Sequence, residues 1–199
     1  MSSRDEILRR VRQHQRLDVS VTEPFTEGII FDDPLTQFAE VLSAVGGQCI
    51  QVATVSEAEQ RLRQIDEYAS AAKTCSRVEG IGATSFDLAS VTDPHEVEDV
   101  DFTILPGDYA VAENAAVWVT ADDPVHRVLH FLTQHLALVV PSNRVLSNLH
   151  EAYERIEVGQ MPFGTWISGP SKTADIEQSL VKGAHGSRTL VVFLVDDLC

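Results

Sequence analysis

One turn near the C-terminal end of the sequence combines residue types that can hold an anion. Residues 166–177 have the pattern of a short apolar strand, a tight turn of small residues and the first turn of a helix. Backbone N–H groups at a helix N-terminus lack intrahelical partners and favour a negative charge. Lys172, one of only three lysines in the chain, lies in this turn. The pattern indicates a small-anion site; the competing interpretation is that Ser171 or Thr173 merely caps the helix.

The end of this turn, Gly-Pro-Ser-Lys-Thr, is superficially similar to the phosphate-binding loop of nucleoside triphosphatases. That motif requires a glycine directly before its lysine and a second glycine five residues earlier. Ser171 and Trp166 occupy those two positions here. Because both glycines are missing, nucleoside triphosphate binding is not expected.

A second candidate is an acidic residue within an apolar stretch. Glu113 and Asn114 interrupt residues 110–119, where a buried strand is expected to begin. A carboxylate in such a position must be hydrogen-bonded, ion-paired or protonated. Glu113 is therefore either a general base or nucleophile at the end of a strand, or a turn residue just outside the sheet. The sequence leaves both interpretations open.

Metal-binding patterns are weak in this sequence. His126 and His130 lie four residues apart on a predicted helix, but residues 127–129 lack the glutamate of the zinc-protease motif. We therefore expect surface or core histidines and no metal site. Cys49, Cys75 and Cys199 form no CxxC pair, so this chain alone is not expected to build an iron–sulfur cluster or zinc knuckle.

Charge and hydropathy exclude several classes of partner. The chain has 30 acidic and 15 basic residues and a formal net charge of −15. Such a surface repels nucleic acid and anionic lipid. No apolar run approaches the ~20 residues of a membrane span, and the N-terminus lacks the apolar core of a signal peptide. With three unpaired cysteines, these features predict a cytoplasmic protein.

The elements that must position the candidate residues follow from periodicity and capping signals. An N-terminal helix and an irregular connector are expected over residues 1–33, followed by an α/β domain over 34–199. Continuous apolar runs alternating with helices predict a mainly parallel sheet covered on both faces. The first expected helix of this domain begins at Asp33-Pro34 and ends at Gly46-Gly47. Three further helices are expected over 56–69, 125–133 and 145–156. The expected strands lie at 49–55, around Ile104 and Val111, and at 116–120, 136–140 and 189–195.

The C-terminal motif also carries a family resemblance. Residues 167–177, followed by Gly183-x-His185-Gly186 and an apolar terminal strand, resemble the LUD-domain proteins, specifically the lactate utilization protein C (LutC) family. The N-terminal Ser-Arg-Asp-Glu-Ile-Leu segment and residues 111–113 are also similar. The resemblance covers most of the chain from about residue 30 onwards.

The resemblance implies an α/β fold like that of sugar-phosphate isomerases and CoA transferases. It also implies a cytoplasmic subunit without a cofactor of its own, which acts in the oxidation of L-lactate to pyruvate beside partner proteins that carry iron–sulfur clusters. We expect a small carboxylate or phosphate near Glu113, held by Ser168, Gly169, Ser171, Lys172, Thr173, His185 and Gly186.

One departure from the family pattern concerns the turn after Glu113. Many relatives have Thr-Gly there, whereas this chain has Asn114-Ala115, which removes a hydroxyl group and a flexible glycine. Glu113-Asn114 is also similar to the Glu-Asn of CoA transferases, in which the glutamate is the nucleophile. A stand-alone transferase or carboxylate-binding enzyme is thus the first alternative, and a non-catalytic structural partner is the second.

Overall fold

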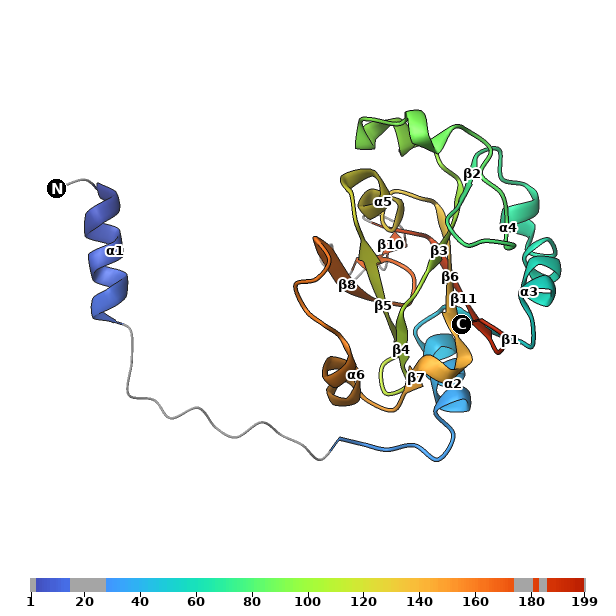
Figure 1. The fold of residues 1–199 in the computed structure, drawn as a ribbon, viewed down its shortest axis with the longest axis horizontal. Coiled ribbons are helices and arrows are strands. Elements are labelled where there is room, and N and C mark those ends of the chain that lie inside the picture. The colour runs from blue at the N-terminus through green and yellow to red at the C-terminus, as the bar shows by residue number, and fades with distance from the viewer. Residues whose placement is uncertain (1–2, 15–27, 174–180, 183–185, 199) are drawn as a thin grey trace.

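Five parallel strands form the centre of the fold (Figure 1). The computed structural model describes residues 3–14, 28–173, 181–182 and 186–198. The strand order is β1-β11-β6-β3-β2, and every neighbouring pair is parallel. The strands are β1 (Gln48–Val52), β2 (Thr74–Ser76), β3 (Phe102–Pro106), β6 (His135–Pro141) and β11 (Thr189–Val195). The prediction of a mainly parallel sheet is confirmed.

Beyond their first residues, His135 and Thr189, the neighbouring strands β6 and β11 are apolar because both faces of the sheet are covered. Along β6, Leu136 and Leu138 pack into one core cluster, whereas Ala137 and Val139 pack into the other. Successive side chains of a strand point to opposite faces, so a strand that is buried on both sides has no polar positions. On one face, α3 (Val55–Leu62) and α4 (Asp66–Ala69) form the cover (Figure 1).

The opposite face is covered by α2 (Pro34–Ala44) and by a second sheet, which the sequence patterns do not predict. This sheet has the order β7-β4-β5-β8. β4 pairs with β7 in parallel, and β5 lies antiparallel to both β4 and β8. Its strands are β4 (Tyr109–Val111), β5 (Ala116–Ala121), β7 (Val145–Leu146) and β8 (Phe163–Ser168). The fold therefore combines helix-on-sheet and sheet-on-sheet packing.

The predicted start of α2 is confirmed in detail. Asp33 caps the helix, and its Oδ1 accepts a hydrogen bond from the Thr36 backbone at 3.1 Å. Pro34 is the first helical residue, where a missing N–H costs nothing. The helix ends at Ala44, Val45 is its C-cap, and Gly46 follows with φ of 89°.

Three predicted helix boundaries are wrong. The helix expected over 56–69 is capped earlier, by Thr54, and is split into α3 and α4. The helix expected over 145–156 is only α6 (Leu149–Arg155), because the preceding residues form β7 on the edge of the second sheet. The helix expected over 125–133 is the shorter α5 (Pro124–Leu129). In each case, local apolar spacing did not distinguish helix from strand or loop.

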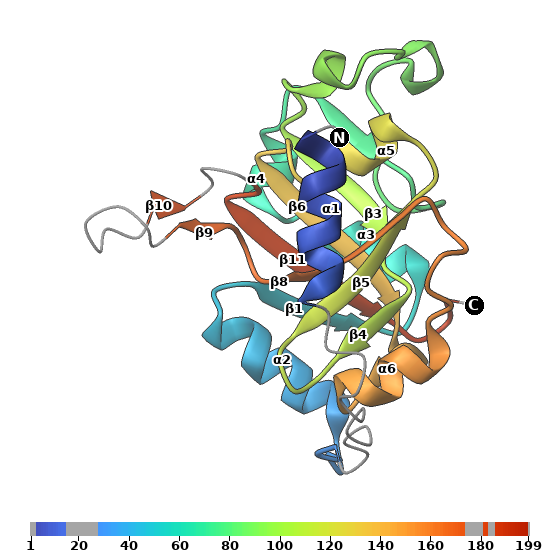
Figure 2. The ribbon, with the colours of Figure 1, turned by 90° about the vertical axis from the view of Figure 1, so that its left-hand side faces the viewer.

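The N-terminal helix is present as α1 (Ser3–Gln13), and none of its residues is buried. Much of the predicted connector lies outside the described residues. The remaining elements are three short 3₁₀ turns and a small hairpin of β9 (Lys172–Thr173) and β10 (Val181–Lys182). Figure 2 shows this hairpin projecting from the body of the domain. No helix within the described ranges is both long and apolar enough to cross a membrane.

Candidate functional site

The turn at residues 168–171 is held tightly by its neighbours. Ser168 ends β8, and its Oγ donates a hydrogen bond to the Asn114 carbonyl at 2.6 Å. Gly169 has φ of 71°, and a Cβ there would lie within 2.9 Å of Val45. The Ser171 N–H donates to the Ser187 carbonyl at 2.8 Å. The turn is therefore a rigid link between the second sheet and the start of β11.

The helix predicted to follow this turn is not formed at residues 172–173, which belong to β9. The antiparallel register pairs Lys172 with Lys182, and the Ser171 N–H is already bonded to Ser187. Over the described residues 171–173, the backbone therefore offers no row of free N–H groups of the helix N-terminal kind. His185 and residues 174–180 lie outside the described residues.

Some of the predicted ligand residues do lie together. A Cβ on Gly186 would approach Ser171 Cβ to 3.2 Å, so these two residues are neighbours. The Lys172 side chain is exposed, and its Nζ lies 3.6 Å from the point where a Cβ on Gly46 would stand. Lys172 thus extends over the turn between α2 and β1, and the anion-binding role remains a prediction.

Glu113 lies in the turn between β4 and β5, just outside the second sheet. Its Oε1 accepts a hydrogen bond from the Leu149 N–H at 2.8 Å, and its own N–H donates to Ser147 at 3.1 Å. Leu149 is the first residue of α6, where backbone N–H groups need acceptors. The carboxylate therefore caps a helix in this structure, and its proposed role as a nucleophile remains a prediction.

The departure at Asn114-Ala115 has a visible structural effect. Ala115 has φ of 53° and is fully buried. This left-handed conformation is the one that glycine adopts without strain. The Asn114 side chain closes the turn, because its Oδ1 accepts a hydrogen bond from Ala116 at 3.1 Å. The turn therefore keeps a glycine-like conformation without a glycine.

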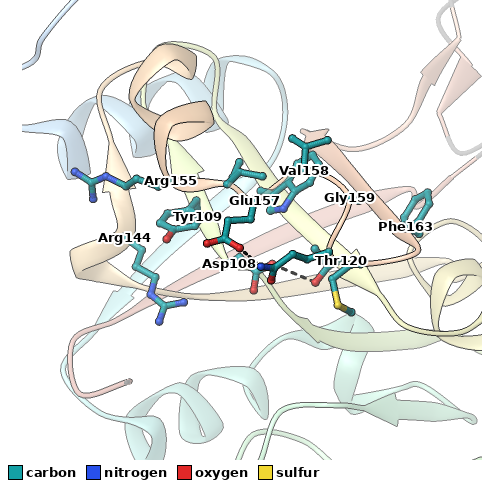
Figure 3. Close-up of a pocket in the computed structure, with 14 residues that line it drawn as sticks. Asp108, Tyr109, Thr120, Arg144, Arg155, Glu157, Val158, Gly159 and Phe163 are labelled. Atoms are coloured by element: carbon teal, nitrogen blue, oxygen red, sulfur yellow. Dashed lines mark hydrogen bonds between the residues drawn. The ribbon is translucent and has the colours of Figure 1, made fainter.

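A large groove lies beside β4, β5 and β8 (Figure 3). Its volume is about 740 Å³. Arg144 and Arg155 lie at the end near Tyr109, and Phe163 lies at the other end. The Arg144 guanidinium is 5.8 Å from the centre of the Tyr109 ring. On the groove wall, Thr120 Oγ1 donates to Asp108 at 3.1 Å.

A smaller cavity of about 160 Å³ adjoins this groove, and both are lined by Thr120 and Met161. We call it the His130 cavity. It lies at the carboxyl ends of β2 and β3, the edge at which parallel α/β sheets usually bind ligands. Its walls consist of Arg77, Leu105, Pro106, Thr120, Ala121, Asp122, His126, His130 and Met161.

Two acidic residues meet His126 at the mouth of this cavity. His126 Nδ1 lies 2.6 Å from Asp122 Oδ1 and also contacts an Asp123 carboxylate oxygen. Asp123 caps α5 by accepting a hydrogen bond from the His126 N–H at 2.8 Å. Of the described residues, these three have side-chain atoms close enough together to share a metal ion. They also satisfy each other as a helix cap and an ion pair.

The sequence patterns did not single out the His130 cavity. Arg77 follows β2, Asp122 follows β5, and His130 ends α5, so the three residues meet only through the fold. A usable signal was present in Asp-Asp-Pro followed by two histidines four residues apart. That spacing places both histidines on one helix face.

Comparison with known proteins identifies the family. A family model described as the LUD domain matches residues 91–195. The Lactate utilization protein C of Bacillus pumilus (strain SAFR-032) is 29% identical over 127 residues, which cover 60% of this chain and 53% of the relative. The Lactate utilization protein C of Geobacillus kaustophilus (strain HTA426) is 31% identical over 106 residues, which cover 50% of this chain and 44% of the relative. The chain thus spans about half the length of these two relatives.

Other matches extend over more of the chain. The Lactate utilization protein C of Halalkalibacterium halodurans is 26% identical over 215 residues, covering 95% of this chain and 91% of the relative. A crystal structure of a DUF162 family protein from Deinococcus radiodurans aligns with a TM-score of 0.57 at 17% identity, over 81% of this chain and 96% of the other. That likeness supports the fold. Because the family model covers more than half of the sequence, the chain belongs to the LUD domain family.

Proposed function

We propose that this protein is a subunit of a lactate utilization system that oxidises L-lactate to pyruvate together with partner proteins carrying iron–sulfur clusters. The main support is the LUD-domain match over residues 91–195, together with relatives named Lactate utilization protein C that align along nearly the whole chain. In this proposal the chain contributes binding and assembly, and its partners carry the electrons.

The positions of the cysteines support a division of labour between subunits. Cys49 lies in β1 and Cys75 in β2, which are the opposite edge strands of the five-strand sheet. Burial raises the pKa of the Cys49 thiol to about 11 and also raises the pKa of Cys75. Iron–sulfur clusters are held by several thiolates around one centre. These two thiols are protonated and separated by three strands, so they do not fit such a cluster.

Reconstitution tests the subunit role. Co-expression with iron–sulfur proteins of a lactate utilization system should yield a complex that reduces a redox dye when L-lactate is added. The same partners without this chain should reduce the dye at least tenfold more slowly. Equal rates for well-formed preparations with and without this chain would contradict the proposal.

A finer part of the proposal concerns the small-anion site at residues 168–173. The register of the hairpin pairs Lys172 with Lys182, so two of the chain's three lysines form one backbone pair. The Lys172 side chain is exposed over the turn between α2 and β1, where its positive charge can attract an anion. Lys172→Ala should reduce the rise in melting temperature produced by phosphate or lactate, whereas Lys172→Arg should preserve it. Equal rises in the wild type and in Lys172→Ala would exclude the site.

A further inference from the structure

The His130 cavity contains a buried acceptor without a partner. His130 is 4% exposed, and its Nε2 has no hydrogen-bond partner among the residues that the structure describes. Its other ring nitrogen, Nδ1, lies 3.2 Å from the His126 carbonyl and 3.3 Å from the Arg127 carbonyl. Because carbonyl oxygens only accept hydrogen bonds, Nδ1 carries the proton and Nε2 is an acceptor. A buried acceptor left unpaired is unfavourable, so a ligand that donates a hydrogen bond to it gains affinity.

Burial also keeps this ring neutral. Desolvation lowers the pKa of His130 and outweighs the hydrogen bonds to the Arg127 and His126 carbonyls, which raise it; the nearby charge of Arg77 lowers it further. The neutral ring keeps its Nε2 lone pair at physiological pH. The cavity therefore offers a fixed acceptor for an O–H or N–H group.

Arg77 supplies a positive charge on the same cavity. It follows β2 directly, and it is close enough to Asp122 and His130 to affect the pKa of both. Within the described part of the chain, the Arg77 guanidinium forms neither an ion pair nor a side-chain hydrogen bond. Asp122 already faces His126 at 2.6 Å. A guanidinium binds a carboxylate through two parallel hydrogen bonds.

The remaining walls are apolar or small, and the cavity is small. Leu105, Ala121 and Met161 offer room for a short aliphatic group. A volume of about 160 Å³ suits a molecule of a few heavy atoms, such as a three-carbon acid, and is much smaller than the neighbouring groove. A suitable ligand thus combines a carboxylate, a nearby hydroxyl donor and a short alkyl group.

We propose that the His130 cavity binds a small 2-hydroxycarboxylate, with Arg77 holding the carboxylate and His130 Nε2 accepting the hydroxyl proton in a hydrogen bond. This inference concerns a different place from the Lys172 turn. It rests on the proposed function only in the choice of L-lactate as the first probe.

A divalent cation is the other ligand to consider, because Asp122, Asp123 and His126 meet at the mouth of the cavity. The position of Arg77 argues against it, since a guanidinium beside Asp122 repels a second positive charge. The carboxylates are also engaged, one as the cap of α5 and both with His126. The anionic ligand therefore fits the charges better than the cation does.

Calorimetric titration of the full chain tests this assignment. L-Lactate and glycolate should bind, whereas propionate, which has no hydroxyl group, should bind at least tenfold more weakly because His130 Nε2 stays unpaired. Arg77→Gln should weaken L-lactate binding at least tenfold. Arg144→Gln, which removes an equal charge from the neighbouring groove, should leave this affinity within about twofold.

His130→Asn provides the sharper variant. The asparagine amide can keep the bond to the helix carbonyls in the place of Nδ1, but it has no acceptor at the position of Nε2. It should bind L-lactate and propionate with equal affinity. Equal binding of the two acids by the wild type, or retained affinity in Arg77→Gln, would overturn the assignment. Mn²⁺ binding that requires His130, or a lack of binding of every hydroxy acid tested, would also overturn the assignment. These results do not depend on lactate oxidation by the reconstituted complex, so the two proposals can fail separately.

Discussion

Replacing Glu113 separates its structural contact from a catalytic role. Glu113→Gln keeps an acceptor for the Leu149 N–H but removes the charge at the start of α6. A charge near a helix N-terminus contributes about 0.3–1 kcal/mol, so we expect the free energy of unfolding to fall by that amount. Glu113→Ala also removes a charge-assisted hydrogen bond, worth about 1.5–3 kcal/mol. Because Glu113 is only partly buried, water screens this bond, and we expect a smaller loss of about 1–2 kcal/mol.

Urea denaturation at pH 7.5, followed by circular dichroism, measures these differences. In a domain of this size, 1 kcal/mol shifts the melting temperature by about 2–4 °C, so Glu113→Ala should melt about 2–8 °C lower. Glu154→Ala is the matched control, because Glu154 is an exposed carboxylate on the same helix. The reasoning fails if Glu113→Ala costs no more than Glu154→Ala. Incubation with CoA thioesters and mass spectrometry tests the transferase alternative separately, because a covalent adduct must appear on Glu113.

Three further perturbations test other contacts. Asn148 caps α6, because its Oδ1 accepts a hydrogen bond from the Glu151 N–H at 3.0 Å, and its Nδ2 donates to the Ile29 carbonyl at 2.9 Å. Asn148→Ala should lower the free energy of unfolding by about 2–3 kcal/mol in the same urea assay. Asn148→Ser keeps a cap and should lower it less. Because the pKa of His130 is lowered in the folded state, the unfolded chain binds more protons as pH falls through about 6.5. The free energy of unfolding should therefore fall from pH 7 to 5, and less steeply in His130→Asn. Equal slopes of unfolding free energy against pH in the wild type and in His130→Asn would refute this. A Cβ at position 164 would overlap the Trp118 ring. Gly164→Ala should therefore lower the free energy of unfolding by about 1–3 kcal/mol and shift the tryptophan emission. Unchanged emission and stability would show that the ring moves freely.

The sequence predicted elements whose local signals agreed with their surroundings. The Asp33-Pro34 start of α2 depends only on nearby residues, and β11 is apolar because both of its faces are buried. The start of β9 could not be predicted, because its geometry is set by Ser171 bonding to Ser187 and by pairing with β10. A helix-like composition there was overridden by contacts with residues further along the chain.

The candidate sites also differ in how far the sequence predicts them. The sequence predicts that Glu113 has a partner, because it is a carboxylate in an apolar stretch. It does not identify that partner as the start of α6. The His130 cavity requires Arg77 and His130, which are far apart in the sequence and belong to elements that meet at one edge of the sheet. Spacing along the chain carries no information about such a meeting.

The hydrogen bond between Asn148 and Ile29 also limits how far the N-terminal helix can reach. It attaches the chain to the domain at Ile29, about 16 residues after α1 ends at Gln13. A chain spans at most ~3.3–3.6 Å per residue, so the end of α1 stays within roughly 55 Å of that attachment in any conformation. Ile7 and Val11 are each 59% exposed on α1. A protein that bound those side chains would be held within that radius of α6, at a raised local concentration.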